Sequence, residues 1–200
     1  LSHIHFASCS DSYNRVIKLG EEKWRVHNVG APQLDDMLQN KKIPKKTIFN
    51  KYKLNLNKKL IIFIQHPVLE EIDSSKFQIE ESLSAIKETN IQTIVIYPNI
   101  DSGNLSIVAS IEKFKSKKIR LYQNIPRSDF INLLRSSDVI VGNSSCGILE
   151  APSFKIPAIN IGNRQKGRLQ ASNVIDCNYD KEEIYRKIKY ALEDKPYLKT

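Results

Sequence analysis

The stretch "VIVGNSSCGILEAPSFKIPAINIGNRQKGR", residues 139–168, holds four of the chain's seven glycines and two of its eight prolines. It contains two short runs rich in Val and Ile, residues 139–141 and 156–161, and each run leads directly into Gly-Asn. Short apolar runs that stop at such turn residues are typical of buried strands. Glycine lets the backbone after a strand adopt a tight turn and approach a ligand closely. The stretch therefore predicts two buried strands, each followed by a tight turn.

The same alternation of short apolar runs and helical patterns extends over the rest of the chain. We predict further strands within residues 4–7, 25–29, 58–66, 92–99, 118–124 and 173–177. We predict helices over residues 10–19, after the Gly-Ala-Pro turn at 30–32, over 75–89, 106–114 and 128–135, from about 147, and over 181–192. Strands that alternate with single helices indicate βαβ units. The expected fold class is therefore α/β, a Rossmann-like parallel sheet with helices on both faces.

Composition is typical of a globular protein with a real core. The 200 residues are 40% hydrophobic and carry a net charge of +9, from 31 basic and 22 acidic residues. The basic residues are scattered, without the basic stripe interleaved with aromatics that a nucleic-acid-binding protein shows, so we expect no nucleic-acid partner. No apolar run approaches the length of a membrane helix, so we expect no membrane partner. The scatter favours a soluble surface, with an anionic ligand as a second possibility.

The three cysteines, Cys9, Cys146 and Cys177, are odd in number and far apart, without Cys-x-x-Cys spacing. This pattern indicates a reducing compartment and no zinc site, so we expect a cytoplasmic protein without a metal. The run Lys41-Lys42-Ile43-Pro44-Lys45-Lys46 carries a proline between two structured patterns and is typical of a solvated linker. We therefore expect residues 1–40 to be the remnant of another domain with its linker, and residues 41–200 to form one α/β domain. The chain opens inside a strand pattern, which indicates a piece of a longer protein.

Polar and turn residues follow four of the expected strands, at 65–67, 97–103, 123–126 and 142–147. The carboxyl ends of parallel strands meet at one edge of a sheet, so these segments are expected to face one crevice. Ser144 and Ser145 would offer hydroxyls and backbone N–H groups to an anion at the start of the next helix. Glu150, one helical turn later, could accept hydrogen bonds from a sugar diol, and Arg164 and Arg168 could contact phosphate.

Each of these residues also has a structural interpretation. Gly-Asn-Ser-Ser is also an ordinary turn between a strand and a helix, with a serine as the helix cap. Taken alone, His66 is more typical of a loop histidine, and Glu150 is equally consistent with an exposed helix residue. Cys146 is either a nucleophile or a packing residue, and packing is favoured because no histidine is near it in the sequence.

The motifs "HPV" at 66–68, "YPNIDSGN" at 97–104, "NIPRSDFINLL" at 124–134 and the stretch 139–168 together resemble the hydrolysing UDP-N-acetylglucosamine 2-epimerases of sialic-acid biosynthesis. The resemblance covers essentially the whole chain, and the ordered set of four motifs is more specific than any one of them. The non-hydrolysing relatives usually carry an Arg-Arg-Glu-type run after the corresponding histidine, where this chain has Pro67-Val68-Leu69. The resemblance therefore favours the hydrolysing branch.

The resemblance implies the C-terminal domain of a two-domain, glycosyltransferase-B-like enzyme with the UDP-sugar between the domains. It implies removal of the C2 proton of UDP-N-acetylglucosamine and expulsion of UDP from C1, giving a 2-acetamidoglucal. Water then adds to give N-acetylmannosamine. By motif position, His66 matches the cleft histidine near the diphosphate and is the catalytic candidate. The positions that match UDP-contacting residues are Asn99, Ile125, Ser144, Ser145, Gly147, Glu150 and Arg164.

The resemblance implies no cofactor, UDP-N-acetylglucosamine and UDP as ligands, and a homo-oligomer for the full-length enzyme. The family's acid/base carboxylates lie in the first domain, upstream of this chain, so the 200 residues alone are expected to be inactive. Two alternatives remain open from the residues. One is a glycosyltransferase domain that uses a UDP-sugar, and the other is a nucleotide-binding module without catalysis.

Overall fold

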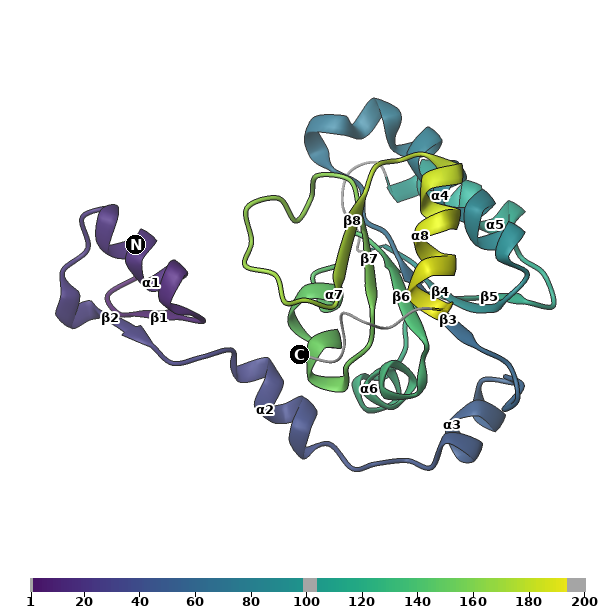
Figure 1. The fold of residues 1–200 in the computed structure, drawn as a ribbon. Helices are drawn as coiled ribbons and strands as arrows, with labels where there is room; N and C mark the ends of the chain where they lie inside the picture. The colour runs from purple at the N-terminus through teal and green to yellow at the C-terminus, as the bar shows by residue number, and fades with distance from the viewer. Residues whose placement is uncertain (1, 99–103, 194–200) are drawn as a thin grey trace. The chain divides into compact units, whose positions relative to one another are not determined.

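The computed structural model describes residues 2–98 and 104–193 (Figure 1). The chain divides into two compact units, unit 1 at Leu1–Lys41 and unit 2 at Lys42–Thr200. Unit 2 makes most of the internal contacts and carries all of the candidate site residues. The two units are described separately below.

Unit 1 is a two-stranded parallel sheet with three short helices. Its elements are β1 (His5–Ala7), α1 (Ser10–Lys18), the 3-10 helix η1 (Lys23–Arg25), β2 (Val26–Asn28) and α2 (Pro32–Gln39). Cys9 stands at the N-cap of α1, and no side chain makes a capping hydrogen bond there. The side chains of Phe6 and Leu19 are 70% and 84% exposed. A two-stranded sheet is too small to enclose an apolar core, so these two side chains remain exposed to solvent.

Unit 2 contains one six-stranded sheet in the order β5-β4-β3-β6-β7-β8, and every neighbouring pair is parallel. The strands are β3 (Leu60–Ile64), β4 (Gln92–Ile96), β5 (Ile119–Tyr122), β6 (Val139–Gly142), β7 (Ala158–Ile161) and β8 (Val174–Cys177). The predicted parallel sheet is therefore confirmed. Val and Ile fill these strands because both faces of the sheet are covered and every side chain along β3, β6 and β7 is buried.

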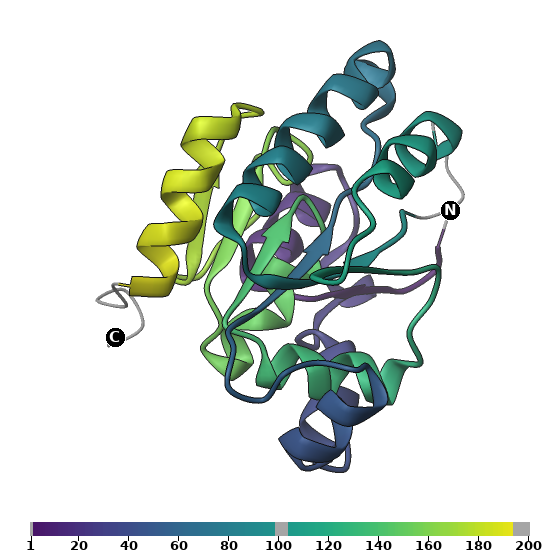
Figure 2. The ribbon, with the colours of Figure 1, turned by 90° about the vertical axis from the view of Figure 1, so that its right-hand side faces the viewer.

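Helices cover both faces of this sheet (Figure 2). They are α3 (Lys45–Lys51), α4 (Ser75–Thr89), α5 (Asn104–Lys113), α6 (Arg127–Ser136), α7 (Cys146–Leu149) and α8 (Lys181–Glu193), with 3-10 helices η2 (Leu69–Ser74) and η3 (Ala151–Phe154). Within residues 2–98 and 104–193, no helix combines the length and the apolar character that crossing a membrane requires.

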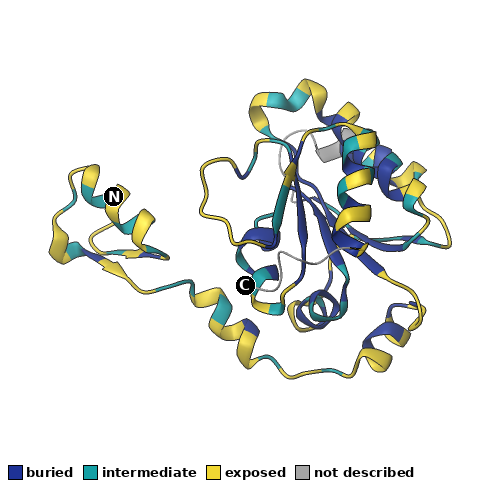
Figure 3. Cartoon of the chain, viewed as in Figure 1, coloured by how far each residue is buried: buried dark blue, intermediate teal, exposed yellow. Residues whose placement is uncertain are grey.

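Two apolar clusters lie on opposite faces of the sheet, and Figure 3 shows both as the buried interior of unit 2. Alternate residues of β3 divide between them: Ile61 and Phe63 pack with α4, α5 and α8, whereas Leu60 and Ile62 pack with α3 and α6. Successive strand side chains point to opposite faces, so one strand serves both layers. The sheet is therefore held from both sides, and its strand ends are rigid supports for the loops that follow.

The expected solvated linker at residues 41–46 is wrong at its C-terminal end. Helix α3 begins at Lys45, with Pro44 as its N-cap residue. Ile48 and Phe49 on this helix are fully buried against the sheet. The sequence did not predict this helix, because lysines surround its short apolar face and seven residues span too few turns for a helical period to be recognised.

A buried carboxylate joins α3 to α6. The Tyr52 hydroxyl donates to Oδ2 of Asp129 at 2.6 Å, and Lys51 Nζ lies 2.6 Å from the same oxygen. Burial alone would raise the pKa of Asp129, but the hydrogen bonds from Lys51 and Tyr52 outweigh it and lower the pKa below its ordinary value. A carboxylate with a lowered folded-state pKa stabilises the fold above its unfolded pKa, and this contribution is lost as pH falls through the folded value.

Asp129→Asn is therefore expected to reduce the free energy of unfolding at pH 7 by about 2 kcal/mol, through loss of charge-assisted hydrogen bonds. The deficit should begin to shrink as pH falls below about 4, where the carboxylate of the unfolded chain becomes protonated, and should disappear only below the lowered folded-state pKa of Asp129. Urea unfolding at pH 7 and pH 3 measures both values, with the exposed Asp73→Asn as the matched control. A deficit that is the same at both pH values would show that the charge of Asp129 does not stabilise unit 2.

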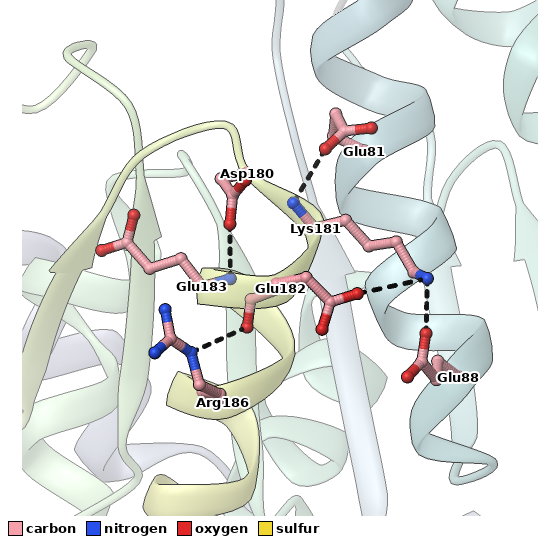
Figure 4. A network of polar contacts seen from close by, with 7 residues as sticks. All are labelled: Glu81, Glu88, Asp180, Lys181, Glu182, Glu183 and Arg186. Carbon is pink, nitrogen blue, oxygen red and sulfur yellow. Dashed lines mark hydrogen bonds and ion pairs between the residues drawn. The ribbon is translucent and has the colours of Figure 1, made fainter.

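The start of α8 is tied to α4 by the polar contacts in Figure 4. The Lys181 backbone N–H donates to Glu81 Oε2 at 2.8 Å, and Lys181 Nζ lies 2.6 Å from Glu88. The Asp180 carboxylate caps the helix by accepting from the Glu183 N–H at 2.7 Å. These contacts order the chain immediately after β8 and thereby fix the last helix on its face of the sheet.

Candidate functional site

The strand order places the site between β3 and β6. From β3 the chain runs outward through β4 to β5, and it then returns to the other side of β3 to build β6, β7 and β8. In an open parallel sheet, a ligand crevice forms at the carboxyl ends of the strands where this reversal occurs. Here those two ends carry His66 after β3 and Asn143 to Ser145 after β6. The residues singled out from the sequence thus lie at the position where this topology forms a crevice.

Asn143 links the two strand ends. Its Oδ1 accepts a hydrogen bond from the His66 backbone N–H at 2.7 Å, and its Nδ2 donates to the His66 carbonyl at 2.8 Å. Its own backbone N–H donates to the Ile64 carbonyl at 3.2 Å. Asn143 is 0% exposed and His66 is 7% exposed. His66 therefore lies in the loop after β3, and one buried amide binds both of its backbone polar groups.

The Asn143 carbonyl reaches the loop that follows β7. It accepts a hydrogen bond from Arg164 Nη1 at 3.2 Å and another from Gln165 Nε2 at 2.8 Å. His66, Ser144 and Arg164 are thereby brought together around one buried residue. Asn143 and Gln165 were missed as site residues from the sequence, although the position of Asn143 between Gly142 and Ser144 was a local signal for it. Arg168, in contrast, is exposed.

Two glycines let the backbone segments of the site pack closely. Gly142 has φ +127°, and a Cβ on it would lie 2.0 Å from the Ile64 carbonyl oxygen. A Cβ on Gly147 would lie 3.1 Å from the Cβ of Ala158 on β7. A side chain at position 147 would therefore need Ala158 to move by a few tenths of an ångström, and glycine lets α7 pack closely on β7 without that shift. Its N–H donates to the Ser144 carbonyl at 3.2 Å.

The two serines lie at the start of α7, which is a single turn. It begins at Cys146, one residue earlier than expected, and ends at Leu149. Ser145 occupies the N-cap position without a side-chain capping bond, whereas Ser144 Oγ accepts a long hydrogen bond from the Cys146 backbone N–H at 3.5 Å. Ser144 Oγ accepts a hydrogen bond from the Cys146 thiol at 3.1 Å. Both serines are half-buried, and their side chains line the loop between β6 and α7.

Cys146 is a packing residue. It belongs to the apolar cluster under α3 and α6 and is 8% exposed. Burial raises the pKa of the Cys146 thiol to about 12, and the nearby charge of Glu150 acts in the same direction. The thiol is therefore neutral at physiological pH, whereas a nucleophilic cysteine needs the thiolate. The nucleophile alternative for Cys146 is set aside.

Glu150 is the C-cap residue of α7 and is 8% exposed, so its interpretation as an exposed helix residue is wrong. Its Oε1 lies 2.8 Å from Nη1 of Arg127, the first residue of α6. Arg127 follows Ile125 by two residues and was missed as a site residue, because the pair is separated by 23 positions in the sequence. Within the described part of the chain, Glu150 Oε2 has no hydrogen-bond partner and can accept from a ligand hydroxyl.

The mouth of the site is an open groove between η2 and the loop after β7. Its lining consists of Pro67, Val68, Leu69, Glu70, Glu71, Asn163 and Arg164. Asn99, predicted from its motif as a ligand contact, lies outside the described residues.

Comparison with known proteins identifies what the chain is similar to. A family model described as UDP-N-acetylglucosamine 2-epimerase matches residues 1–200. The chain is 37% identical over 200 residues to the UDP-N,N'-diacetylbacillosamine 2-epimerase (hydrolyzing) of Legionella pneumophila, covering 100% of this chain and 53% of the relative. It is 31% identical over 191 residues to the UDP-N-acetylglucosamine 2-epimerase of Neisseria meningitidis, covering 96% of this chain and 50% of the relative. The chain thus spans about half the length of these curated relatives.

Solved structures share the fold. The UDP-GlcNAc 2-epimerase of Neisseria meningitidis bound to UDP-GlcNAc matches with a TM-score of 0.77 at 19% identity, covering 98% of this chain and 55% of that one. The enzyme of Methanocaldococcus jannaschii in complex with UDP-GlcNAc and UDP matches with a TM-score of 0.72 at 18% identity, covering 96% of this chain and 55% of that one.

Proposed function

The chain belongs to the UDP-N-acetylglucosamine 2-epimerase family, and we propose from this premise that it is the UDP-binding half of a hydrolysing 2-epimerase. The observation that carries the proposal is the convergence at the β3/β6 strand ends. His66, Ser144 and Arg164 meet around Asn143, and Glu150 lies one helical turn further on. Donors gathered at this edge suit an anion, and the buried carboxylate suits a diol.

In the proposed complex the parts of UDP are held by different residues. The hydroxyls of Ser144 and Ser145 and the guanidinium of Arg164 bind the diphosphate, with His66 beside it. Glu150 accepts hydrogen bonds from the ribose diol, and the backbone of Ile125 meets the base. Asn99 and Gly147 complete the set that the family motifs propose. Charge-assisted bonds to the phosphates supply most of the orientation, because they are stronger than neutral hydrogen bonds.

The proposed reaction is an elimination followed by hydration. The C2 proton of the sugar is removed, the C1–O bond breaks, and UDP departs with the bonding electrons to leave a 2-acetamidoglucal. Water then adds its hydroxyl to C1 and a proton to C2, which gives the free 2-epimeric sugar. The residues of this chain hold UDP and stabilise its charge as it leaves, an electrostatic contribution that strengthens as negative charge develops. The acid/base carboxylates are proposed to come from the other half of the enzyme.

Two sugars are candidates for the UDP-linked substrate. The motifs favour UDP-N-acetylglucosamine, which the Neisseria relative carries in its name. The relative that is 37% identical over the whole chain is named for UDP-N,N'-diacetylbacillosamine, a sugar with a second acetamido group. Both share UDP and a 2-acetamido group, so the site described above fits either. UDP release from each compound by the full-length enzyme decides between them.

Binding of UDP by the purified chain should be much tighter than binding of uridine. The hydroxyls of Ser144 and Ser145 and the Arg164 guanidinium act on phosphate charge that uridine lacks. Added salt should reduce the preference, because partly exposed ion contacts are screened. Isothermal titration with both ligands at two salt concentrations measures it. Equal affinity for UDP and uridine would show that the Gly-Asn-Ser-Ser loop has only a structural role, and it would remove the support for a nucleotide site.

The double variant Ser144→Ala/Ser145→Ala should lose UDP affinity by about tenfold, the equivalent of one hydrogen bond to a charged group. Uridine affinity should change little, because the proposed base and ribose contacts lie elsewhere. The exposed Ser153→Ala is the matched control and should change neither affinity. If the double variant instead lost melting temperature with no change in the UDP-to-uridine ratio, the two serines would be structural only.

A further inference from the structure

We propose that Asn143 is a positioning residue that sets His66 and Arg164 against the diphosphate of the ligand. The inference rests on the proposed function, since it concerns how the same site is assembled. Asn143 does not contact the ligand in this account. It acts through His66 and Arg164. Its side-chain Oδ1 and Nδ2 bind the His66 backbone, and its backbone carbonyl binds Arg164.

The Asn143 side chain continues the pairing of β3 with β6 beyond the point where the strands end. The last paired residues of the two strands are Ile64 and Gly142. Asn143 follows Gly142 directly. Its side-chain amide accepts a hydrogen bond from the His66 N–H at 2.7 Å and donates one to the His66 carbonyl at 2.8 Å. A side-chain amide offers the same donor and acceptor as a peptide group. It therefore takes the place of a strand partner for His66, which lies beyond the last residue pair of β3 and β6.

The Asn143 main chain makes the second connection. Its carbonyl accepts from Arg164 Nη1 and from Gln165 Nε2, so one oxygen fixes both side chains of the loop after β7. A guanidinium has five N–H donors in a rigid fork, so one bond to this carbonyl orients the others without using them up. The carboxyl ends of β3, β6 and β7 are thereby joined at a residue that is 0% exposed.

Loss of the Asn143 amide leaves the His66 N–H and carbonyl buried without these partners. Buried polar groups without hydrogen bonds destabilise the folded state, so the segment at His66 shifts to positions where these groups find other partners. The displacement affects the diphosphate side of the site. The ribose side is held separately, by the ion pair between Glu150 and Arg127. A positioning role therefore predicts a selective loss of diphosphate recognition.

Asn132→Ala is a closely matched control. Asn132 is 1% exposed, and its amide likewise receives one backbone N–H, from Ile43 at 2.9 Å, and donates to one backbone carbonyl, of Ser128 at 2.9 Å. Both variants remove a buried amide that holds a backbone donor and a backbone acceptor. Their effects on melting temperature should therefore be comparable, whereas only Asn143 touches His66 and Arg164.

The test measures the affinities of the purified chain for UDP and for uridine. Asn143→Ala should lower the UDP-to-uridine affinity ratio by about tenfold, the loss of one well-placed bond to a charged group, while Asn132→Ala leaves the ratio unchanged. Gln165→Met keeps the volume and removes only one donor to the Asn143 carbonyl. It should lower the ratio by a few-fold, and it remains a test if Asn143→Ala does not fold.

Failure of this inference is distinguishable from failure of the proposed function. If wild type prefers UDP over uridine and the folded variants keep the full ratio, Asn143 is structural only and the nucleotide site stands. An equal loss of the ratio in Asn132→Ala would also overturn the positioning role, because the effect would then follow from general destabilisation. If wild type binds the two ligands equally, the proposed function itself fails.

Discussion

Replacing Gly142 by alanine is expected to reduce the free energy of unfolding of unit 2 by about 4 kcal/mol, among the largest effects of a single substitution. A Cβ at this position would lie 2.0 Å from the Ile64 carbonyl oxygen and 2.7 Å from its carbon, both backbone atoms. That oxygen cannot turn away freely, because it accepts the Asn143 N–H. Relief of the clash requires β3 and β6 to separate at the centre of the sheet, where both faces are packed.

Gly167→Ala is the control for Gly142→Ala. Gly167 also has a positive φ, +77°, but nothing lies within 4 Å of a Cβ built on it. Gly167→Ala should therefore reduce the free energy of unfolding only by the cost of holding alanine in the left-handed conformation, about 1–2 kcal/mol. Urea unfolding of wild type and both variants, followed by far-UV circular dichroism, measures the difference. A loss in Gly142→Ala no greater than in Gly167→Ala would show that the strand ends are less closely packed than the structure indicates.

The second large effect is on binding. Glu150→Ala is expected to weaken UDP binding by one to two orders of magnitude, because a ribose diol held by a carboxylate loses charge-assisted hydrogen bonds worth roughly 1.5–3 kcal/mol. The Arg127 guanidinium, 2.8 Å from Glu150 Oε1 in wild type, is left without this carboxylate and adds to the loss. Titration calorimetry on the folded variant measures the affinity. The exposed Glu182→Ala on α8 removes the same carboxylate away from the site and should have no effect.

Comparison of UDP with 2'-deoxy-UDP shows whether Glu150 itself meets the ribose. Wild type should lose affinity when the 2'-hydroxyl is absent, and Glu150→Ala should bind the two ligands almost equally. This double comparison isolates the pairwise contribution of the carboxylate and the hydroxyl from any general effect on the site. An unchanged affinity of Glu150→Ala for UDP would remove Glu150 from the proposed ribose contact.

The elements of unit 2 could be predicted because their signals are local. Val and Ile runs such as 139–141 indicate buried strands wherever they occur, and a helix such as α4 repeats its apolar residues within a few turns. Alternation of the two then allows few arrangements other than a covered parallel sheet. Helix α3 was not predicted, because its apolar face consists only of Ile48 and Phe49 and is surrounded by lysines. Its burial depends on the sheet beneath it, which no local pattern encodes.

The amino-acid sequence by itself determined the strands, most of the helices, and the set of loops at which His66, Ser144, Ser145 and Glu150 stand. Only the tertiary structure decided what those residues touch. Asn143 reaches His66 across 77 positions and Gln165 across 22, and Arg127 reaches Glu150 across 23. These partners come from different strand ends, and nothing near either member of a pair specifies the other. His66, Asn143 and Gln165 meet because the strand order reverses at β3, which places the ends of β3, β6 and β7 side by side and buries their backbone groups where each must find a partner.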